Sequence, residues 1–150
     1  MRYLLDTGIL LRLPHRNDPQ HSVIRAALRN LTSSDHRFVT TRQNMAEFWN
    51  VCTRPADARG GFGLPINDVI RRMRLLERFI EVLSEPQSAY ARWKQLVVQY
   101  SIKGKQVHDA RIVALMTAHR ITQLLTLNFE DFRRFREIQP VSPAAIAVQR

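Results

Sequence analysis

Short apolar runs alternate with longer amphipathic stretches along the whole chain. The apolar runs have the length of buried strands, and most of them end at a polar or turn-forming residue. The strands that we expect are residues 3–5, 37–41, 80–83, 123–127 and 138–141.

In the stretches between these runs, apolar residues recur every three or four positions, which is the spacing of an amphipathic helix. The helices that we expect are residues 7–13, 24–31, 45–52, 66–80, 86–100, 109–119 and 129–135. Strands that alternate with helices along a chain predict an α/β domain with a mainly parallel central sheet of about five strands.

Segments without this periodicity separate some of the elements. Residues 56–64 contain three glycines and are expected to form a flexible loop, and residues 101–107 are expected to form a polar one. The helix at 109–119 is apolar on most sides, so we expect it to be well buried. Trp49, Trp93 and the tyrosines fall in helical stripes, which is more typical of core positions than of base-stacking platforms.

The length and composition indicate one domain over residues 1–150. Of the 150 residues, 45% are hydrophobic, which is enough for one ordinary core. No apolar run approaches the length that spans a bilayer, and Asp6 interrupts the first apolar residues too early for a secretory signal. Cys52 is the single cysteine, so no intramolecular disulfide can form. We therefore expect a cytoplasmic protein.

Basic residues outnumber acidic residues by 23 to 13, which gives a formal net charge of +10. An excess of this size favours polyanions, because bound phosphates release their counterions. All but three of the basic residues are arginines, and a general bias towards arginine would produce the same excess. The charge therefore favours a nucleic-acid partner without establishing one.

Several acidic residues occur where elements of an α/β sheet meet. Asp6 directly follows the first expected strand, Asp109 opens the buried helix, and Glu47 lies one turn into the helix after the second strand. Segments that leave the carboxyl ends of parallel strands converge on one crevice. Carboxylates gathered there repel one another, and a hard divalent cation such as Mg²⁺ relieves that repulsion. Such an ion can also activate water against a phosphodiester.

Each acidic residue also has a purely structural interpretation. Asp6 and Asp109 could cap the helices that follow them, and Glu47 could be a solvated residue on the flank of its helix. Asp131 could pair with the arginines that follow it. Residue types and spacing alone leave both interpretations open, and only the joint pattern favours a metal site.

Four segments, in this order, resemble the motifs of PIN-domain ribonucleases. They are LLDTGIL at 4–10, QNMAEFWNV at 43–51, VHDARIVA at 107–114 and TLNFEDF at 126–132. No single segment is specific, but the ordered set covers nearly the whole chain. The resemblance implies a three-layer α/β/α fold, and the length suits the VapC-like toxins of bacterial toxin–antitoxin pairs.

The resemblance further implies an endoribonuclease that depends on Mg²⁺ or Mn²⁺. By matched position, Asp6 and Asp109 would be the main metal ligands. Glu47 would complete the cluster through a direct or water-mediated contact and help to orient the attacking water. Asn128 stands where the family often has an aspartate, so the fourth position lacks a negative charge, and a second tightly held metal is in doubt. Asp131 is a candidate to compensate.

The resemblance also implies partners: an RNA substrate, a cognate antitoxin protein and a second copy of the chain in a homodimer. Thr7 is expected to steady the end of the first strand or to touch a metal-bound water. Arg42 and Arg111 flank the expected crevice in sequence and are candidates for phosphate contacts, as are Lys103 and Lys105.

Two other functions fit parts of the pattern. A catalytically degenerate module that binds RNA or a protein partner would explain Asn128, although intact Asp6, Glu47 and Asp109 argue against it. A receiver-like phosphotransfer domain also gathers acidic residues at strand ends. Such a domain needs a lysine after a late strand, whereas the last lysine here precedes the fourth expected strand.

Overall fold

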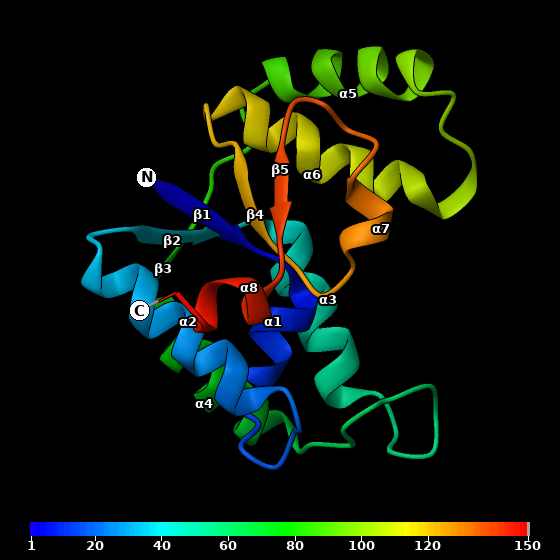
Figure 1. Ribbon diagram of the computed structural model, residues 1–150. Helices are drawn as coiled ribbons and strands as arrows, with labels where there is room; N and C mark the ends of the chain where they lie inside the picture. Colours follow the sequence, from blue (N-terminus) through cyan, green and yellow to red (C-terminus); the bar gives the residue numbers. More distant parts are fainter. Residues whose placement is uncertain (150) are drawn as a thin grey trace.

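Five parallel strands form the centre of the molecule, in the order β3-β2-β1-β4-β5 (Figure 1). The strands are β1 Arg2–Leu5, β2 Arg37–Thr40, β3 Ile80–Val82, β4 Gln123–Leu125 and β5 Gln139–Val141. All four neighbouring pairs run parallel, so the predicted type of sheet is confirmed. The structure is a computed structural model that describes residues 1–149.

Helices cover both faces of this sheet. They are α1 Thr7–Arg12, α2 His21–Ser33, α3 Arg42–Thr53, α4 Ile66–Glu77, α5 Ser88–Gln99, α6 Val107–Ala118, α7 Phe129–Phe132 and α8 Pro143–Ala147. The short 3-10 helix η1, Gly104–Gln106, leads into α6. Figure 1 shows α5 and α6 on one side of the sheet, with α2, α4 and α8 on the other, and the two core clusters divide these helices in the same way. The predicted three-layer α/β/α architecture is therefore confirmed.

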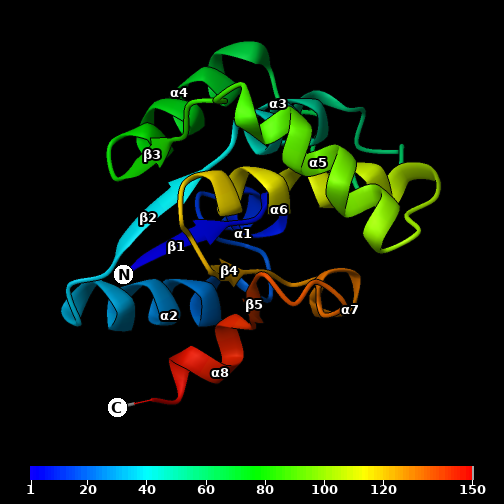
Figure 2. The ribbon, with the colours of Figure 1, turned by 90° about the horizontal axis from the view of Figure 1, so that it is seen from above.

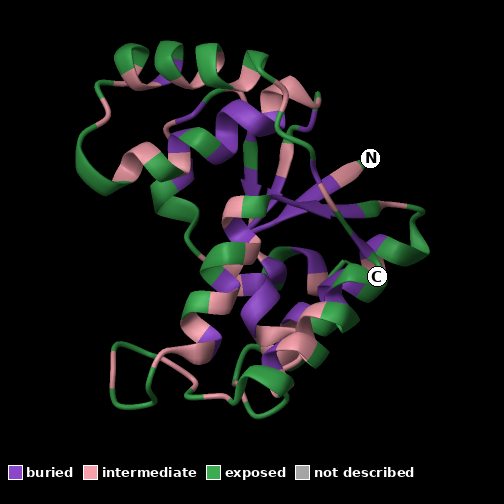
Figure 3. Cartoon of the chain, turned by 180° about the vertical axis from the view of Figure 1, so that it is seen from behind, coloured by how far each residue is buried: buried purple, intermediate pink, exposed green. Residues whose placement is uncertain are grey.

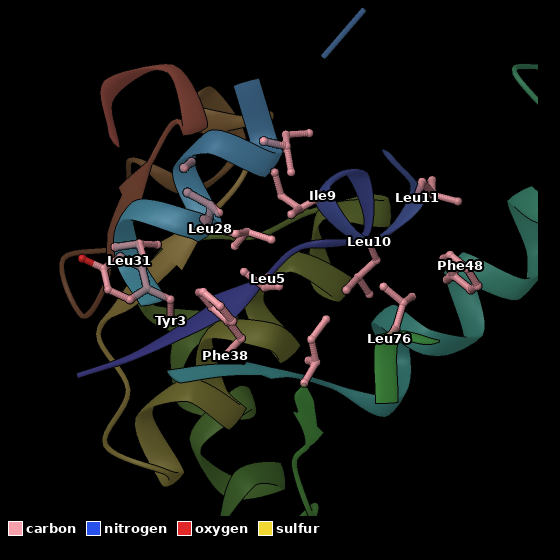
Figure 4. Packing of buried hydrophobic residues seen from close by; sticks show 14 of the residues in the cluster. Tyr3, Leu5, Ile9, Leu10, Leu11, Leu28, Leu31, Phe38, Phe48 and Leu76 are labelled. Atoms are coloured by element: carbon pink, nitrogen blue, oxygen red, sulfur yellow. The ribbon is translucent and has the colours of Figure 1, made fainter. Parts of the chain in front are cut away.

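The alternation of side chains along β1 divides the core into two clusters. Tyr3 and Leu5 pack with residues of α1 to α4 on one face of the sheet, as Figure 4 shows for most of that cluster. Leu4 points to the opposite face and packs with α5, α6 and α7. Because both faces are covered by helices, every strand residue of β1 after Arg2 is buried, which is typical of a parallel sheet.

Helix α6 is buried on most sides, as its composition predicted. Six of its twelve residues are buried, and Figure 3 shows the buried residues gathering in the strands and in this helix. Helix α5 lies against α6 (Figure 2) and is much more exposed, since Leu96 is its one buried residue. Tyr90 on α5 is 65% exposed, so the expectation that every tyrosine lies in the core is wrong for this residue.

Several element boundaries differ from the predicted ones. Val107, expected in a loop, begins α6. The fourth strand ends at Leu125 rather than residue 127, because the Thr126 hydroxyl accepts the backbone N–H of Asn128 at 2.9 Å and turns the chain. Helix α8 was not predicted, although Ser142 caps it by accepting the N–H of Ala145.

No helix within residues 1–149 is long and apolar enough to cross a membrane.

The order of the strands determines which side chains meet. Strand β1 lies in the middle of the sheet, with β2 and β4 as its neighbours. The residues that leave the carboxyl ends of these three strands are Asp6, Thr41 and Thr126, and all three are buried. They therefore lie together at one edge of the sheet, where ligands bind in open α/β folds.

Candidate functional site

Asp6 occupies the turn between β1 and α1. Its backbone N–H donates to the carbonyl of Leu125 at 3.1 Å, which extends the pairing of β1 with β4 by one residue. Its side chain accepts the N–H of Thr7 at 2.9 Å and so caps α1. The capping interpretation is therefore correct for Asp6, but this bond engages only one of its two carboxylate oxygens.

Polar side chains surround the Asp6 carboxylate, which is only 6% exposed. The hydroxyl of Thr126 donates to Oδ2 at 2.7 Å, and the amide of Asn44 donates to Oδ1 at 3.2 Å. Burial raises the pKa of Asp6, while the bonds from Thr126, Thr7 and Asn44 oppose that rise. These donors orient the carboxylate and partly offset the effect of burial on its pKa.

Asn44 joins three segments of the site. It lies on α3 and is 1% exposed; its amide also donates to the hydroxyl of Thr7 at 2.9 Å. Its Oδ1 accepts the hydroxyl of Thr41, the N-cap residue of α3, at 2.6 Å. Sequence reasoning did not select Asn44 as a site residue. The signal was a threonine followed three residues later by a polar residue at a helix start, which usually indicates only a cap.

Asp109 lies in the first turn of α6, and the negative charge of Asp6 acts on its carboxylate. The carboxylate is half-buried, and no hydrogen bond from residues 1–149 is among the interactions that act on it. Burial, together with the negative charges of Asp131 and Asp6, raises the pKa of Asp109 to about 6. Arg134 and His108 act in the opposite direction. The charge of Asp109 is not among the causes of the shift at Asp6, so a metal site shared by Asp6 and Asp109 stays a prediction.

Asp131 is the third carboxylate near these two. It lies in the short helix α7, is exposed, and its charge raises the pKa of both Asp6 and Asp109. Among residues 1–149 no ion pair joins Asp131 to the arginines that follow it, and the nearby ion pair joins Arg133 to Glu130 of α7.

The other two predicted site residues are more peripheral. Glu47 is exposed on α3, one turn beyond Asn44, and its charge is not among those that shift Asp6 or Asp109. Asn128 has an exposed side chain, and it contributes a backbone N–H to the Thr126 hydroxyl. The metal-ligand role of Glu47 therefore stays a prediction.

Three arginines of the segments that carry the site, Arg42, Arg111 and Arg134, form what we call its basic border. Arg42 is exposed at the first position of α3, and Arg111 is exposed on α6, where it pairs with Glu85 at 3.5 Å. Arg134, which follows α7, contacts the side chain of Gln106 in η1, and its positive charge acts on Asp109.

The donor set suits a hard cation that keeps part of its hydration shell. Within residues 1–149, no three His, Cys, Asp or Glu side chains are close enough together to enclose one metal ion. Two carboxylates whose charges oppose each other are nevertheless what Mg²⁺ typically takes from a protein, with water and phosphate oxygens as the remaining ligands. Asp109, half-buried and without a hydrogen-bond donor, fits such an ion.

Comparison with known proteins places this arrangement among known folds. A family model described as PIN domain matches residues 3–138. A search of curated proteins found no match.

Several solved structures share the fold. VapBC2 from Rickettsia felis, crystallised with a DNA fragment from its promoter, has 16% identity and a TM-score of 0.68 over 95% of this chain and 98% of that chain. VapBC-1 from nontypeable Haemophilus influenzae has 19% identity and a TM-score of 0.68, with the same coverage. VapC20 from Mycobacterium tuberculosis, a toxin that cleaves the sarcin-ricin loop, has 17% identity and a TM-score of 0.60 over 92% and 99% of the two chains.

Proposed function

Because the chain belongs to the PIN-domain family, we propose that it is a metal-dependent endoribonuclease with Asp6 and Asp109 at its reaction centre. The observation that carries this proposal is the half-buried Asp109 carboxylate. Its pKa is raised to about 6 by burial and by the charges of Asp131 and Asp6. A protein gains nothing in stability by gathering such charges, so their arrangement fits a site that binds a cation.

Each residue has a distinct part in this proposal. Asp6 and Asp109 hold Mg²⁺ or Mn²⁺, while Asp131 supplies a third negative charge. Thr126 and Asn44 act through Asp6 by fixing its carboxylate. When bound, the ion would activate water and neutralise charge that develops on the phosphodiester.

Glu47 and the basic border complete the proposed site. Exposed Glu47 orients the attacking water and reaches the ion through a water molecule rather than directly. Arg42 and Arg111 contact phosphates on either side of the cleaved bond. The net charge of +10 draws the RNA to a site that is itself negative.

The direct test is cleavage of RNA by the purified protein. We expect cleavage with added Mg²⁺ or Mn²⁺ and none in excess chelator. Asp6→Asn and Asp109→Asn should each slow cleavage by about 100-fold or more, because an ion supplies several kcal/mol of transition-state stabilisation. Asp57→Asn, in an exposed loop, is the matched control and should cleave normally. Cleavage that survives in chelator, or in the double mutant, would refute the proposal.

We also propose that the protein is the toxin of a toxin–antitoxin pair and forms a homodimer. Relatives with this fold were crystallised as VapBC complexes. A groove of about 640 Å³ between α2 and α4 offers a place for an antitoxin segment, because exposed Leu75 and Phe79 lie there among arginines of both helices. The complementary segment would be amphipathic and acidic.

Expression in a bacterial host tests the toxin proposal. We expect the wild-type protein to arrest growth, Asp109→Asn to be harmless, and the neighbouring small gene to suppress the arrest. Leu75→Asp should weaken that suppression and leave RNA cleavage unchanged, since the groove is separate from the aspartates. Normal growth with abundant wild-type protein would contradict the toxin role while leaving the nuclease role intact.

The rival function is a module that binds RNA or a partner without cleaving it. The observation in its favour is Asn128, an uncharged side chain at the fourth acidic position. The same cleavage assay separates the two functions. Binding of RNA without cleavage at any Mg²⁺ or Mn²⁺ concentration would favour the non-catalytic module.

A further inference from the structure

A cavity of about 440 Å³ opens beside the aspartates, between α5 and α6. Its walls are mostly apolar, and they include Ala89, Tyr90 and Trp93 of α5 and Ile112 of α6. Its size falls in the range of roughly 300–1,000 Å³ that is typical of small-ligand sites. None of the proposed catalytic carboxylates lines it, so the proposed reaction does not account for it.

Hydrogen bonds connect this cavity to the proposed reaction centre. Gln43, which lines the cavity, donates its amide N–H to the carbonyl of His108 at 3.0 Å, directly before Asp109. Thr41, also in the wall, bonds to Asn44, which in turn contacts Asp6. The cavity is therefore adjacent to the carboxylates on the side of α3 and α6.

An aromatic pair, exposed Tyr90 and half-buried Trp93, forms one wall. Tyr90 and Trp93 stack with their ring centres 6.1 Å apart and their planes 28° from parallel. The indole N–H of Trp93 donates to the carbonyl of Val107 at 2.8 Å, which fixes its ring against the start of α6. Tyr90 is 65% exposed, and the ammonium of Lys94 lies 5.7 Å from its ring centre, which adds positive charge beside the exposed ring. Exposed rings beside a basic border are the usual platform for unpaired bases.

Two polar side chains in the walls suit a nucleotide. The Oε1 of Gln43 is buried and has no hydrogen-bond partner within residues 1–149, which leaves one acceptor available to a base amino group. Arg111 borders the cavity, and its pairing with Glu85 spans 3.5 Å with both side chains partly exposed. A phosphate can compete for such a weak, solvated pair.

We infer that this cavity binds one unpaired nucleobase of the RNA strand next to the phosphodiester at the aspartates. This inference rests on the proposed function and adds a specificity subsite to it. The base stacks on Tyr90 and Trp93, Gln43 accepts from its amino group, and Arg111 contacts the phosphate of the same nucleotide. Cleavage then depends on the identity of that base, and the substrate must be single-stranded there, because a paired base cannot enter.

The direct test measures binding without cleavage. The chain has two tryptophans, so a Trp49→Phe protein leaves Trp93 as its single indole reporter. Single-stranded RNA hexanucleotides are titrated into this protein in excess chelator, and quenching of Trp93 fluorescence reports stacking. We expect quenching by RNA with a base at the subsite and none when that position is abasic.

Variants of the exposed ring make the test specific. Tyr90→Ala should weaken hexanucleotide binding about 5- to 20-fold, at the lower end of the range for base–aromatic stacking. Tyr90→Phe keeps the ring and should bind normally. Gln43→Leu should change which base is preferred, and sequencing the ends of cleaved RNA measures this preference. The cleavage rate at the preferred sequence of each protein should change less than the base preference does.

The outcomes separate this inference from the proposed function. If the wild-type protein cleaves RNA but Tyr90→Ala cleaves with the same KM and base preference, the subsite is wrong and the nuclease role stands. If no RNA is cleaved under any condition, the proposed function fails, and Trp93 quenching by RNA alone still supports the subsite. If Tyr90→Ala alters only the oligomeric state in sedimentation, a second copy of the chain covers this cavity and the inference is overturned.

Discussion

The hydroxyl of Thr126 donates a 2.7 Å hydrogen bond to Oδ2 of Asp6 across a separation of 120 residues. Both residues stand just beyond the ends of adjacent parallel strands, β1 and β4, which bring them side by side. The same hydroxyl accepts the N–H of Asn128 at 2.9 Å. Thr126 therefore joins the central carboxylate to the turn that leads into α7 and Asp131.

Thr126→Val tests this connection. The substitution keeps the shape of the side chain but leaves a buried carboxylate oxygen and the Asn128 N–H without their partner. We expect a loss of about 2 kcal/mol in the free energy of unfolding at pH 7, measured by denaturant titration. Affinity for Mg²⁺ should fall by about 10- to 100-fold, as for other residues that orient a ligand. Thr126→Ser restores the hydroxyl and should recover most of the stability and most of the Mg²⁺ affinity. If Thr126→Val had the stability and Mg²⁺ affinity of the wild-type protein, Thr126 would not orient Asp6.

Asn44 is the second residue that orients Asp6, and Asn44→Asp places a new carboxylate beside it. In chelator, repulsion between these two buried groups should destabilise the protein more than Asn44→Leu, which only removes hydrogen bonds. Added Mg²⁺ should raise the stability of Asn44→Asp by more than that of Asn44→Leu, because the new carboxylate adds negative charge beside the proposed ligands that both variants keep. Thermal unfolding with and without Mg²⁺ measures both effects. Asn50→Ala, exposed on the same helix, is the control and should change stability by less than about 0.5 kcal/mol.

Substitutions of Asp131 and Glu47 should differ in their effect on the pKa of Asp109. The charge of Asp131 helps to raise the pKa of Asp109, so Asp131→Asn should lower that pKa below its value of about 6. Glu47→Gln should leave the pKa of Asp109 unchanged. Carboxyl NMR titration of Asp109 in metal-free protein measures the difference. An equal effect of both substitutions would mean that Glu47 lies as close to the cluster as Asp131 does.

The raised pKa of Asp109 makes the stability of the metal-free protein depend on pH. Between about pH 4 and pH 6 the native state binds a proton at this carboxyl that the unfolded chain releases, so this group lowers stability as the pH rises through that window. Asp109→Asn removes the free energy needed to ionise this half-buried carboxyl in the native state. The substitution should therefore stabilise metal-free protein above pH 6, by on the order of 1 kcal/mol because the group is only half-buried.

The same comparison has a built-in control at low pH. Below about pH 4 both proteins carry a neutral group at this position, so the difference in unfolding free energy should vanish. With saturating Mg²⁺ at pH 7 the order should reverse, because only the wild-type protein keeps both proposed ligands. A stability difference that is the same at pH 3.5 and pH 7.5 would show that titration of Asp109 is not its cause.

Local sequence patterns predicted most strands and helices of this protein and two of its candidate site residues. The periodicity of apolar residues predicted the strands and the longer helices, because burial of one face is a local property that repeats along each element. The composition of residues 109–119 predicted a buried helix for the same reason. Asp6 at a strand end and Asp109 at a helix start could be identified as candidates, since strand ends converge in any open parallel sheet.

What the sequence could not determine is which side chains meet there. The order β3-β2-β1-β4-β5 makes β1 and β4 neighbours, and this order depends on packing between residues more than a hundred positions apart. It is this packing that sets Thr126 and Asn44 against Asp6 and makes Asp131, rather than Glu47, the charge that acts on Asp109. The exposure of Tyr90 was equally non-local, because it depends on how α5 lies over α6 and not on the stripe to which the residue belongs.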